Sequence, residues 1–469
     1  MRPTTTNKRI ERSSFRDPSG VVYFENGEIH RQINVSYKEN YDFLMESGLY
    51  QALVDSHLLI PHREVSAASA LSDRCYKIIR PEQIKYISYP YEWCFEQLKD
   101  AALSTLNAQK IAFNHGMSLK DASAYNIQFH NGRPLLIDTL SFERYREGDV
   151  WVAYRQFCQH FLAPLALMSL RDIRLNLLSR NHIDGIPLDL ASKLLPWRSW
   201  LMPSVAMHIH MHARSQARFG AASVSRRRAI STARISVAGF QGIVESLERA
   251  IKRLKWKLPN TEWADYYSST NYDDISFKHK EELVRKYVER LSPSPNTIQD
   301  LGANTGVFSR IAAKESSFAI CQDIDPVAVQ KNYSHMREKE EKNILPLLMD
   351  LTNPSPATGW ANNERMSLAE RGEVDLLLAL ALIHHLAISN NLPLERIAEF
   401  FSRIGKNAIV EFVPKNDSQV ERLLAAREDI FDDYNQVEFE KAFSAYFDIL
   451  DCAKVDGSER LIYLMARRK

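Results

Sequence analysis

One stretch in the second half of the chain constrains the fold more than any other. Residues 297–301 form a short apolar run that leads into a loop containing Gly302 and Gly306, and a helical pattern follows. The chain then returns as a second apolar run, 318–322, which ends in Asp323. A tight turn from strand to helix needs glycine. The order strand, loop, helix and strand therefore predicts a βαβ unit of a parallel sheet.

The loop spacing and the acid after the second strand indicate a nucleoside ligand without a diphosphate. The pattern Gly302-x-x-x-Gly306 lacks the third close glycine that lets a backbone approach a pyrophosphate at a helix N-terminus. Asp323 stands where a carboxylate accepts hydrogen bonds from both hydroxyls of a ribose. An adenosyl group with a methionine tail satisfies both constraints.

The stretch from Thr297 to Asp323 resembles the cofactor half-site of class I S-adenosylmethionine-dependent methyltransferases. The resemblance implies that S-adenosyl-L-methionine is the cofactor and that an acid after the third strand meets the adenine amino group. The residues that the resemblance assigns to cofactor binding are Asp300, Gly302, Asn304, Gly306, Asp323 and Asp350. An aromatic segment upstream, 263–274, is either a lid that closes over the cofactor, with Tyr272 in contact with it, or a set of ordinary packing residues.

The remainder of the C-terminal half continues an α/β pattern. Apolar runs at 344–349, 374–380 and 407–413 predict three further strands, the second of them buried on both faces. Two last runs, 447–455 and 461–466, flank Asp456-Gly457, a dipeptide typical of hairpins. Together with the resemblance, these runs predict a Rossmann-like seven-stranded methyltransferase sheet over residues 258–469.

Three residues near strand ends are candidates for catalysis. His384 and His385 follow the predicted central strand, and Glu411 lies in the next one. Methyl transfer mainly requires alignment of the acceptor, and a base is needed only where the acceptor must lose a proton. An imidazole titrates near neutrality and can take that proton, although a histidine at a strand end often only packs or caps.

The N-terminal half has a second signature around residue 121. Asn126 follows Asp121 by five positions, and Asp138 follows Asn126 by twelve, across a predicted hairpin at Asn131-Gly132. This spacing resembles the catalytic segment of the protein-kinase-like and aminoglycoside-phosphotransferase-like fold. The resemblance implies an α+β kinase-like domain over residues 1–212. In it Asp121 would orient an acceptor hydroxyl, while Asn126 and Asp138 would hold Mg²⁺ on ATP.

The same segment departs from that pattern in several places. The histidine that usually stands just before the first Asp is missing, Asp138 is followed by Thr-Leu rather than Phe-Gly, and no glycine-rich loop is visible. Lys77 is one candidate for the lysine that would contact phosphates. The sequence leaves open an active kinase, a degenerate scaffold that binds the acceptor, and an ordinary polar hairpin with this spacing by chance.

Residues 213–257 are predicted to be a basic linker followed by a helix. The linker is rich in arginine, and the helix, with apolar residues at helical spacing from 239 onward, is expected to pack on the methyltransferase domain. Just before the linker, His208, His210 and His212 alternate. In a strand they would share one face as metal ligands, whereas in a helix they would point apart.

Composition bears on the cellular compartment of the protein but identifies no binding partner. A net charge of +2 gives no indication of nucleic-acid binding. Five scattered cysteines without a C-x-x-C pair fit reduced thiols in a cytoplasmic protein. No apolar leader or membrane span is apparent in the sequence.

These patterns support three functional hypotheses. The first is a methyltransferase that acts on an oxygen, nitrogen or carbon of a small molecule or glycan, with the kinase-like domain as a substrate-binding module or scaffold. The second is a bifunctional kinase and methyltransferase that modifies a glycan or small molecule. The third is a non-catalytic cofactor-binding module. Acceptor pockets in such folds are built from insertions and neighbouring domains, so the sequence identifies no acceptor.

Overall fold

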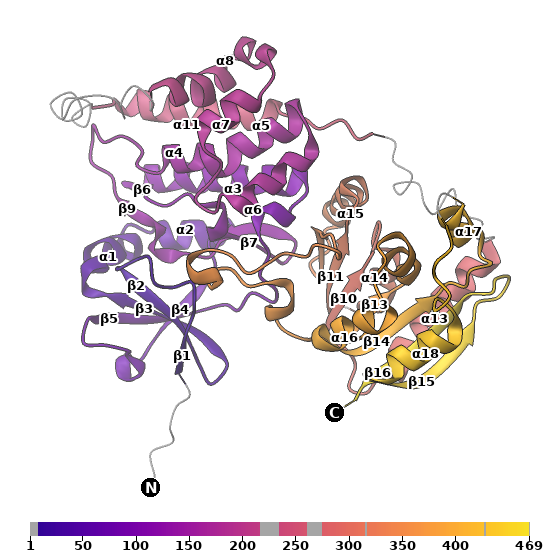
Figure 1. Cartoon of the computed structure of the whole chain (residues 1–469). Coiled ribbons are helices and arrows are strands. Elements are labelled where there is room, and N and C mark those ends of the chain that lie inside the picture. Colours follow the sequence, from indigo (N-terminus) through magenta and orange to yellow (C-terminus); the bar gives the residue numbers. More distant parts are fainter. Residues whose placement is uncertain (1–7, 216–233, 260–273, 315–316, 426–427, 469) are drawn as a thin grey trace, which may run out of the picture. The chain divides into compact units, whose positions relative to one another are not determined.

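The computed structural model describes residues 8–215, 234–259, 274–314, 317–425 and 428–468, and the chain divides into two compact units (Figure 1). Unit 1 consists of Met1–Lys257 together with Ala357–Arg365. Unit 2 consists of Leu258–Pro356 and Met366–Lys469. The main division lies between residues 257 and 258, and a short excursion from the second half of the chain, residues 357–365, belongs to unit 1.

Unit 1 begins with a five-stranded antiparallel sheet in the order β1-β2-β3-β5-β4. Its strands are β1 (Lys8–Ile10), β2 (Gly20–Glu25), β3 (Glu28–Asn34), β4 (His62–Val65) and β5 (Cys75–Pro81). Helices α1 (Lys38–Glu46) and α2 (Leu49–Asp55) lie between β3 and β4 in the chain. The β2–β3 hairpin turns at Asn26-Gly27, where both residues have positive φ, as favoured two-residue hairpin turns require.

The second part of unit 1 is mainly helical and carries two small sheets, β6 with β9 and β7 with β8 (Figure 1). The β6–β9 pairing encloses the segment that contains Asp121, Asn126 and Asp138, and the β7–β8 hairpin lies between Asn126 and Asp138. The elements of this part are α3 (Phe95–Asn114), β6 (Met117–Leu119), β7 (Ile127–His130), β8 (Arg133–Leu136), β9 (Phe142–Arg144), α4 (Tyr154–Phe157), α5 (Ala163–Leu170), α6 (Leu178–Asn181), α7 (Leu188–Leu194), α8 (Pro203–Val205) and α11 (Val237–Arg253).

Helix α11 packs within unit 1, so the expectation that it packs on the methyltransferase domain is wrong. Its Phe240 ring stacks on Phe113 of α3, with 4.7 Å between centroids. Glu248 of α11 pairs with Lys110 of α3 at 2.5 Å. The apolar spacing correctly indicated a helix with one buried face, but such spacing does not reveal which body covers that face. The arginine-rich stretch 216–233 lies outside the described residues.

The segment Ala357–Arg365 comes from the connection between two strands of unit 2 and is part of unit 1. It closes on itself through an antiparallel bridge between Thr358 and Arg365. The Glu364 carboxylate pairs with the guanidinium of Arg16. Arg365 lies over the Tyr125 ring, 4.3 Å from its centroid. Its polar and aromatic contacts are thus made with residues of the N-terminal half.

Unit 2 is built on a seven-stranded sheet in the order β12-β11-β10-β13-β14-β16-β15. The first five of these strands run parallel, and β16 is antiparallel to both of its neighbours. The strands are β10 (Thr297–Leu301), β11 (Phe318–Asp323), β12 (Ile344–Leu348), β13 (Val374–Ala379), β14 (Gly405–Phe412), β15 (Phe447–Lys454) and β16 (Leu461–Arg467). This is the methyltransferase-like α/β sheet that the sequence predicts, including its terminal antiparallel pair.

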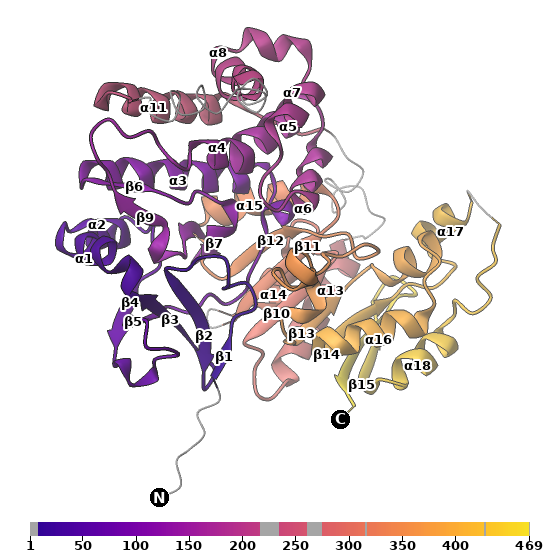
Figure 2. The same ribbon diagram turned by 60° about the vertical axis from the view of Figure 1, so that its left-hand side comes forward.

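Helices cover the sheet of unit 2 and bury its central strands. Figure 2 shows α16 and α18 beside each other, and α16 also packs on β13 and β14. The buried residues Leu394, Ile397, Phe401 and Ile404 recur along α16 at helical spacing and so form the apolar stripe that faces the core. The helices are α13 (Asp274–Arg290), α14 (Val307–Ala312), α15 (Pro326–Glu338), α16 (Leu394–Ile404), α17 (Ser418–Leu424) and α18 (Gln436–Ser444).

The order of the strands locates the place where a ligand would bind. Strand β10 pairs with β11 on one side and with β13 on the other. The chain therefore continues from β10 to β11 towards one edge of the sheet, and from β13 to β14 towards the other edge. Ligands of open α/β sheets bind outside the carboxyl ends of the strands at such a switch point.

Candidate functional site

The loop after β10 adopts the left-handed backbone that its glycines predict. Gly302, Asn304 and Gly306 all have positive φ, of 75°, 49° and 79°. A Cβ on Gly306 would stand 2.6 Å from side-chain atoms of Arg310 and Asn332. Glycine at position 306 thus satisfies both the backbone conformation and the space. Helix α14 begins directly after this residue.

Asp323 fastens the loop to the end of β11. Its Oδ2 accepts a hydrogen bond from the Asn304 amide at 2.7 Å, and its Oδ1 accepts one from the Asp325 amide at 2.8 Å. Burial raises the pKa of Asp323 to about 6, and these backbone hydrogen bonds oppose the shift. Each carboxylate oxygen has a second lone pair. Asp323 therefore keeps acceptor capacity toward a ligand while it shapes the loop.

Two other predicted acids stand at neighbouring strand ends. Asp300 is buried at the end of β10 and accepts a hydrogen bond from Ser309 Oγ at 2.6 Å. Burial raises its pKa to about 7, and the hydrogen bond from Ser309 opposes that shift. Asp350 follows β12 and accepts hydrogen bonds from the amide and hydroxyl of Thr352. The carboxyl ends of three adjacent strands therefore each carry an acid.

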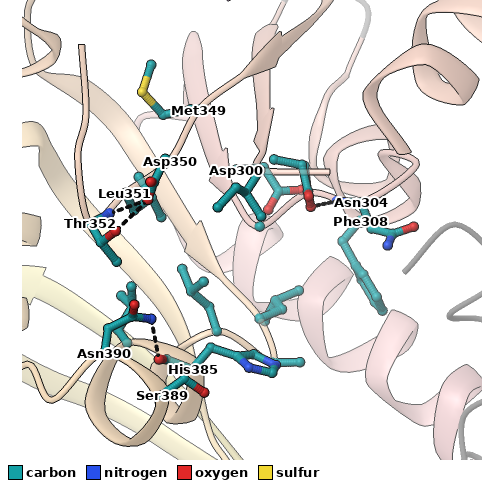
Figure 3. A pocket seen from close by; sticks show the side chains of 18 of the residues that line it. Asp300, Asn304, Phe308, Met349, Asp350, Leu351, Thr352, His385, Ser389 and Asn390 are labelled. Carbon is teal, nitrogen blue, oxygen red and sulfur yellow. Dashed lines mark hydrogen bonds between the residues drawn. The ribbon is translucent and has the colours of Figure 1, made fainter. Parts of the chain in front are cut away.

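These strand ends border a cavity of about 350 Å³ (Figure 3). In the close-up, Asp350 and Thr352 lie on the left, Asp300 and Asn304 lie to their right, and His385 lies below them. The described residues that line the cavity are Phe277, Lys280, Asp300, Gly302, Ala303, Asn304, Phe308, Asp323, Ile324, Met349, Asp350, Leu351, Thr352, Leu380, Ala381, Leu382, His385, Leu386, Ser389, Asn390 and Leu423. The volume and the largely apolar wall with a few polar groups suit a small-molecule site.

The two adjacent histidines differ in their surroundings. His385 opens the π-helical turn His385–Ser389 and lines the cavity. Burial and, to a smaller extent, nearby Arg460 together lower its pKa to about 4, so the imidazole is neutral at pH 7. His384 does not line the cavity and is fully buried, and neither of its ring nitrogens has a hydrogen-bond partner among the described residues. Of the two predicted bases, only His385 faces the cavity.

Glu411 is buried at the end of β14 and takes part in an ion-pair network. Its Oε2 accepts hydrogen bonds from Lys280 Nζ at 2.5 Å and from the Ala381 amide at 2.7 Å. Its Oε1 lies 3.6 Å from Arg460, which also pairs with Asp417 at 2.7 Å. Glu411 does not line the cavity. Its position therefore favours a role in holding the cavity wall over direct contact with a substrate.

Several lining residues were not singled out from the sequence. Phe277 and Lys280 of α13, three positions apart, face the cavity together with Phe308 of α14. That spacing places the first two on one helical face, and this was the available signal. Ser389 and Asn390 carried no such signal, because they reach the cavity through a π-helical turn. Tyr272, predicted to bind the cofactor, and the lid segment up to residue 273 lie outside the described residues.

In unit 1 the three residues of the kinase-like pattern lie on connected segments. Asp121 Oδ1 accepts a hydrogen bond from the Ser123 amide. The Asn126 side chain donates to Ser141 Oγ at 3.2 Å. Asp138 caps the short helix 139–141 by accepting from the Leu140 amide. The fold thus brings the segments that carry Asn126 and Asp138 together at residue 141.

These side chains do not fit a magnesium–nucleotide site. Asp138 pairs with the guanidinium of Arg31, from β3, at 2.7 Å. The Asn126 amide nitrogen is turned toward Ser141. Among the described residues, no cluster of three or more His, Cys, Asp or Glu side chains is arranged to hold a metal ion. Lys77, the candidate for contacting phosphates, lies on β5 and pairs with Glu64.

The alternating histidines of unit 1 lie in a π-helical turn, Ala206–Met211, and in the residue that follows it. His208 hydrogen-bonds to Tyr154 and Ser246. His210 hydrogen-bonds to Ser192 and Ser199. Both imidazoles thus meet hydroxyl groups, and burial lowers the pKa of each. The strand arrangement that would have grouped the imidazoles as metal ligands is wrong.

Comparisons with solved structures return S-adenosylmethionine-dependent methyltransferases. Magnesium protoporphyrin IX methyltransferase (ChlM) from Synechocystis PCC 6803 is 14% identical with a TM-score of 0.32, over 44% of this chain and 93% of that one. The N-methyltransferase NodS from Bradyrhizobium japonicum WM9 is 10% identical with a TM-score of 0.31, over 42% and 99%. The bifunctional kinase-methyltransferase WbdD is 14% identical with a TM-score of 0.29, over 43% and 42%.

No protein-family model matches the sequence. Among the described residues, the helices are all too short or too polar to cross a bilayer. A curated protein, nodulation protein NoeA of Rhizobium meliloti (strain 1021), is 35% identical over 458 residues, which span 97% of this chain and 95% of that protein. A likeness of this extent covers both units. The chain belongs to the family of nodulation protein NoeA.

Proposed function

We propose that this protein is an S-adenosylmethionine-dependent methyltransferase, and that unit 1 binds or presents the acceptor. One observation carries the proposal: the left-handed loop 302–306 and the carboxylate of Asp323 meet beside a cavity at the switch point of the sheet. The amides of Gly302 and Gly306 donate to the carbonyls of Gln322 and Ala303 and so are not directed at a diphosphate. Acid, loop and cavity volume together suit an adenosyl ligand of this size.

Each of the polar residues that line the cavity would contact a different part of the cofactor. When bound, S-adenosylmethionine supplies a sulfonium-activated methyl group. Asp323 would accept hydrogen bonds from the ribose hydroxyls, and Asp350 would face the adenine. The loop around Gly302 and Asn304, together with Asp300, would hold the amino-acid end of the cofactor. The protein thereby fixes the direction of an in-line displacement, which is the main requirement of this reaction.

His385 would act as the base where the acceptor must lose a proton. Its imidazole lines the cavity and, with a pKa of about 4, is neutral at pH 7 but a weak base. It would therefore accept a hydrogen bond from the acceptor hydroxyl or amine and take the proton as methylation makes that group more acidic. Ser389 and Asn390 lie on the same wall and offer hydrogen bonds to a polar acceptor. A hydroxyl- or amine-bearing small molecule or glycan suits these groups.

Calorimetric titration of the full-length protein with S-adenosylmethionine and with S-adenosylhomocysteine tests the proposal. We expect one site with a dissociation constant in the micromolar range, about −8 kcal/mol. A titration with ATP at the same concentrations is the control for general nucleotide affinity. Failure to bind either sulfur ligand would overturn the proposal. Binding of S-adenosylmethionine without methyl transfer to any candidate glycan would favour a cofactor-binding module.

We infer that unit 1 is a kinase-like scaffold without phosphotransfer activity. The support is the Arg31–Asp138 pair, because a guanidinium already neutralises the carboxylate on which a metal site would depend. The side chains of Arg31 and Asp138 are only 13% and 16% exposed. A pair buried to this extent has a structural role that an exposed one lacks.

Replacement of Asp138 is therefore expected to cost stability and not nucleotide binding. Asp138→Asn leaves the Arg31 guanidinium with only its longer ion pair, to Asp17 at 3.9 Å, and we expect the free energy of unfolding to fall by about 1–3 kcal/mol. Differential scanning fluorimetry with and without ATP and Mg²⁺ checks both points. Glu245→Gln, which removes an exposed helical ion pair of the same unit, is the matched control. Magnesium-dependent stabilisation of the wild type by ATP, lost in Asp138→Asn, would instead favour the bifunctional enzyme.

A further inference from the structure

The helical part of unit 1 presents a group of large apolar side chains to solvent. In the short 3-10 helix Trp197–Leu201, Trp197 is 77% exposed and Leu201 is 72% exposed. In the π-helical turn of the alternating histidines, Met207 and Met211 are exposed as well. Helix α8 joins these two segments, and Figure 1 shows it at the end of unit 1 opposite the five-stranded sheet. Large apolar side chains that gather at a surface mark an interaction site, whereas single scattered ones do not.

The 3-10 helix turns a polar side chain inward and its large apolar side chains outward. Ser199, in the middle of this helix, is buried, and its hydroxyl lies 2.8 Å from His210 Nε2. The hydroxyl of Ser192, from α7, lies 2.7 Å from Nδ1 of the same imidazole. An ordinary surface helix buries its apolar side and exposes its polar side. The reversed arrangement here leaves the apolar side without a function inside the fold.

Trp200 holds the 3-10 helix against the π-helical turn. Its ring stacks on His210, with centroids 4.2 Å apart and ring planes 13° apart. The guanidinium of Arg214 lies 4.3 Å from the centroid of the Trp200 ring. The exposed side chains of both segments therefore belong to one surface, which we call the α8 surface. It consists of Trp197, Arg198, Trp200, Leu201, Met207, Met211 and Arg214.

The same part of the chain is strongly basic. Residues 190–244 contain eight lysines and arginines and no aspartate or glutamate. The whole chain has a net charge of +2, so all other residues together carry −6. Residues 216–233 lie outside the described residues, but Arg198 and Arg214 are exposed on the α8 surface itself. Positive charge is therefore concentrated where the large apolar side chains reach solvent.

This combination of groups discriminates between the partners that such a surface could bind. A second copy of the chain would bring the same positive charge to the contact and repel it. A nucleic acid would match the charge but would leave Leu201 and the two methionines without an apolar partner. The surface of an anionic bilayer offers phosphates to arginine and an apolar layer directly beneath them. Tryptophan in particular favours that boundary, because its ring is apolar and its N–H is polar.

We propose that the α8 surface docks on the surface of an anionic phospholipid bilayer. Trp197 and Leu201 insert between the headgroups, and Arg198 and Arg214 contact lipid phosphates. The protein thereby binds one face of the bilayer without crossing it. The inference concerns unit 1 and does not depend on the proposed methyl transfer.

Co-sedimentation of the full-length protein with vesicles tests the proposal. Phosphatidylcholine vesicles with about 30% phosphatidylglycerol supply the anionic surface, and vesicles of phosphatidylcholine alone are the neutral reference. We expect the wild type to bind the anionic vesicles at least about tenfold more tightly than the neutral ones. Salt at about 0.5 M should reduce this binding, because it screens the arginines.

Two double variants separate the apolar and the basic contributions. Trp197→Ala with Leu201→Ala removes the most exposed apolar side chains and should weaken binding to anionic vesicles by about tenfold or more. Arg198→Gln with Arg214→Gln should weaken it to a similar extent, about tenfold. Circular dichroism establishes that each variant is folded, as expected from the exposure of the substituted side chains.

The controls carry the same substitutions elsewhere in unit 1. Trp360→Ala removes a tryptophan that is 74% exposed in the segment 357–365. Arg63→Gln with Arg133→Gln removes two exposed arginines, one from β4 and one from β8. Both controls should bind anionic vesicles within about twofold of wild type.

Three results would overturn the proposal. The first is a wild type that does not bind anionic vesicles. The second is loss of binding in the arginine variant with full binding in the Trp197 and Leu201 variant, which would show a surface that attracts anions of any kind. The third comes from light scattering without lipid: a wild-type dimer that the Trp197 and Leu201 variant converts to monomers, with no vesicle binding by either, would assign the surface to a second copy of the chain.

Discussion

Asp323→Ala is expected to weaken the binding of S-adenosylhomocysteine by about 100-fold or more, because hydrogen bonds to a charged group contribute about 1.5–3 kcal/mol each. The substitution removes the proposed ribose acceptor. It also releases the amides of Asn304 and Asp325, which the carboxylate holds at 2.7 and 2.8 Å. Calorimetric titration of the full-length variant measures the effect.

Asp448→Ala provides the matched control for this loss of charge. Asp448 belongs to the same unit, and its side chain is 59% exposed in a surface ion pair. Its removal should leave affinity unchanged. Asp323→Asn is expected to fall between wild type and Asp323→Ala, since the amide retains one oxygen acceptor. Affinity of Asp323→Ala within threefold of wild type would remove Asp323 from the binding site.

The pH dependence of the same carboxyl group gives an independent check. Burial raises the pKa of Asp323 to about 6, and the ionised form is the stronger acceptor. Affinity should therefore rise between about pH 5 and pH 7.

The contribution of Asp323 to the free energy of unfolding changes with pH in the opposite direction, falling as pH rises. A carboxyl group with a raised folded-state pKa contributes stability below its unfolded value, about 3.9, and loses it as pH rises through the folded value.

Glu411→Ala is expected to lower the free energy of unfolding of unit 2 by about 3–5 kcal/mol, the cost of breaking a buried ion pair on one side. It leaves the buried ammonium of Lys280 and the guanidinium of Arg460 with less counter-charge, and it removes the acceptor of the Ala381 amide. Urea denaturation followed by circular dichroism measures the change. Separate transitions must be fitted, because two units need not unfold in one step.

The control for Glu411→Ala is Glu459→Ala. Glu459 pairs with Lys454 in the same unit, and its side chain is 62% exposed, so its loss should change stability by less than about 1 kcal/mol. Glu411→Gln should be intermediate, because it keeps an oxygen for the Ala381 amide. A Glu411→Ala variant within about 1 kcal/mol of wild type would show that the network contributes little to stability.

The sheet of unit 2 was predictable because its signals are local. Parallel strands buried on both faces appear as continuous apolar runs, and β10 and β11 have the bounds expected from the sequence. The glycine loop was predictable because a left-handed backbone favours glycine, which the sequence has at positions 302 and 306. The acids at the strand ends were predictable because each stands at or near the end of an apolar run in the sequence.

Features that depend on distant partners were not predictable. Lys280 and Glu411 are 131 positions apart, and their pairing becomes visible only once α13 packs beside β14. Arg31 and Asp138 meet across two parts of unit 1, which turns an apparent metal ligand into half of an ion pair. His384 and His385 are neighbours in sequence, yet the π-helical turn sends only one toward the cavity.

The excursion of residues 357–365 bears on how this protein can be dissected. The chain enters unit 2 after residue 257, returns to unit 1 at residue 357 and leaves it again at residue 365. A fragment cut at residue 257 would carry Glu364 and Arg365 without Arg16 and Tyr125, the groups that they contact in the whole chain. The methyltransferase-like half is therefore not an independent module, because a truncation or gene fusion that divides the chain at residue 257 leaves residues 357–365 of unit 1 on the C-terminal fragment.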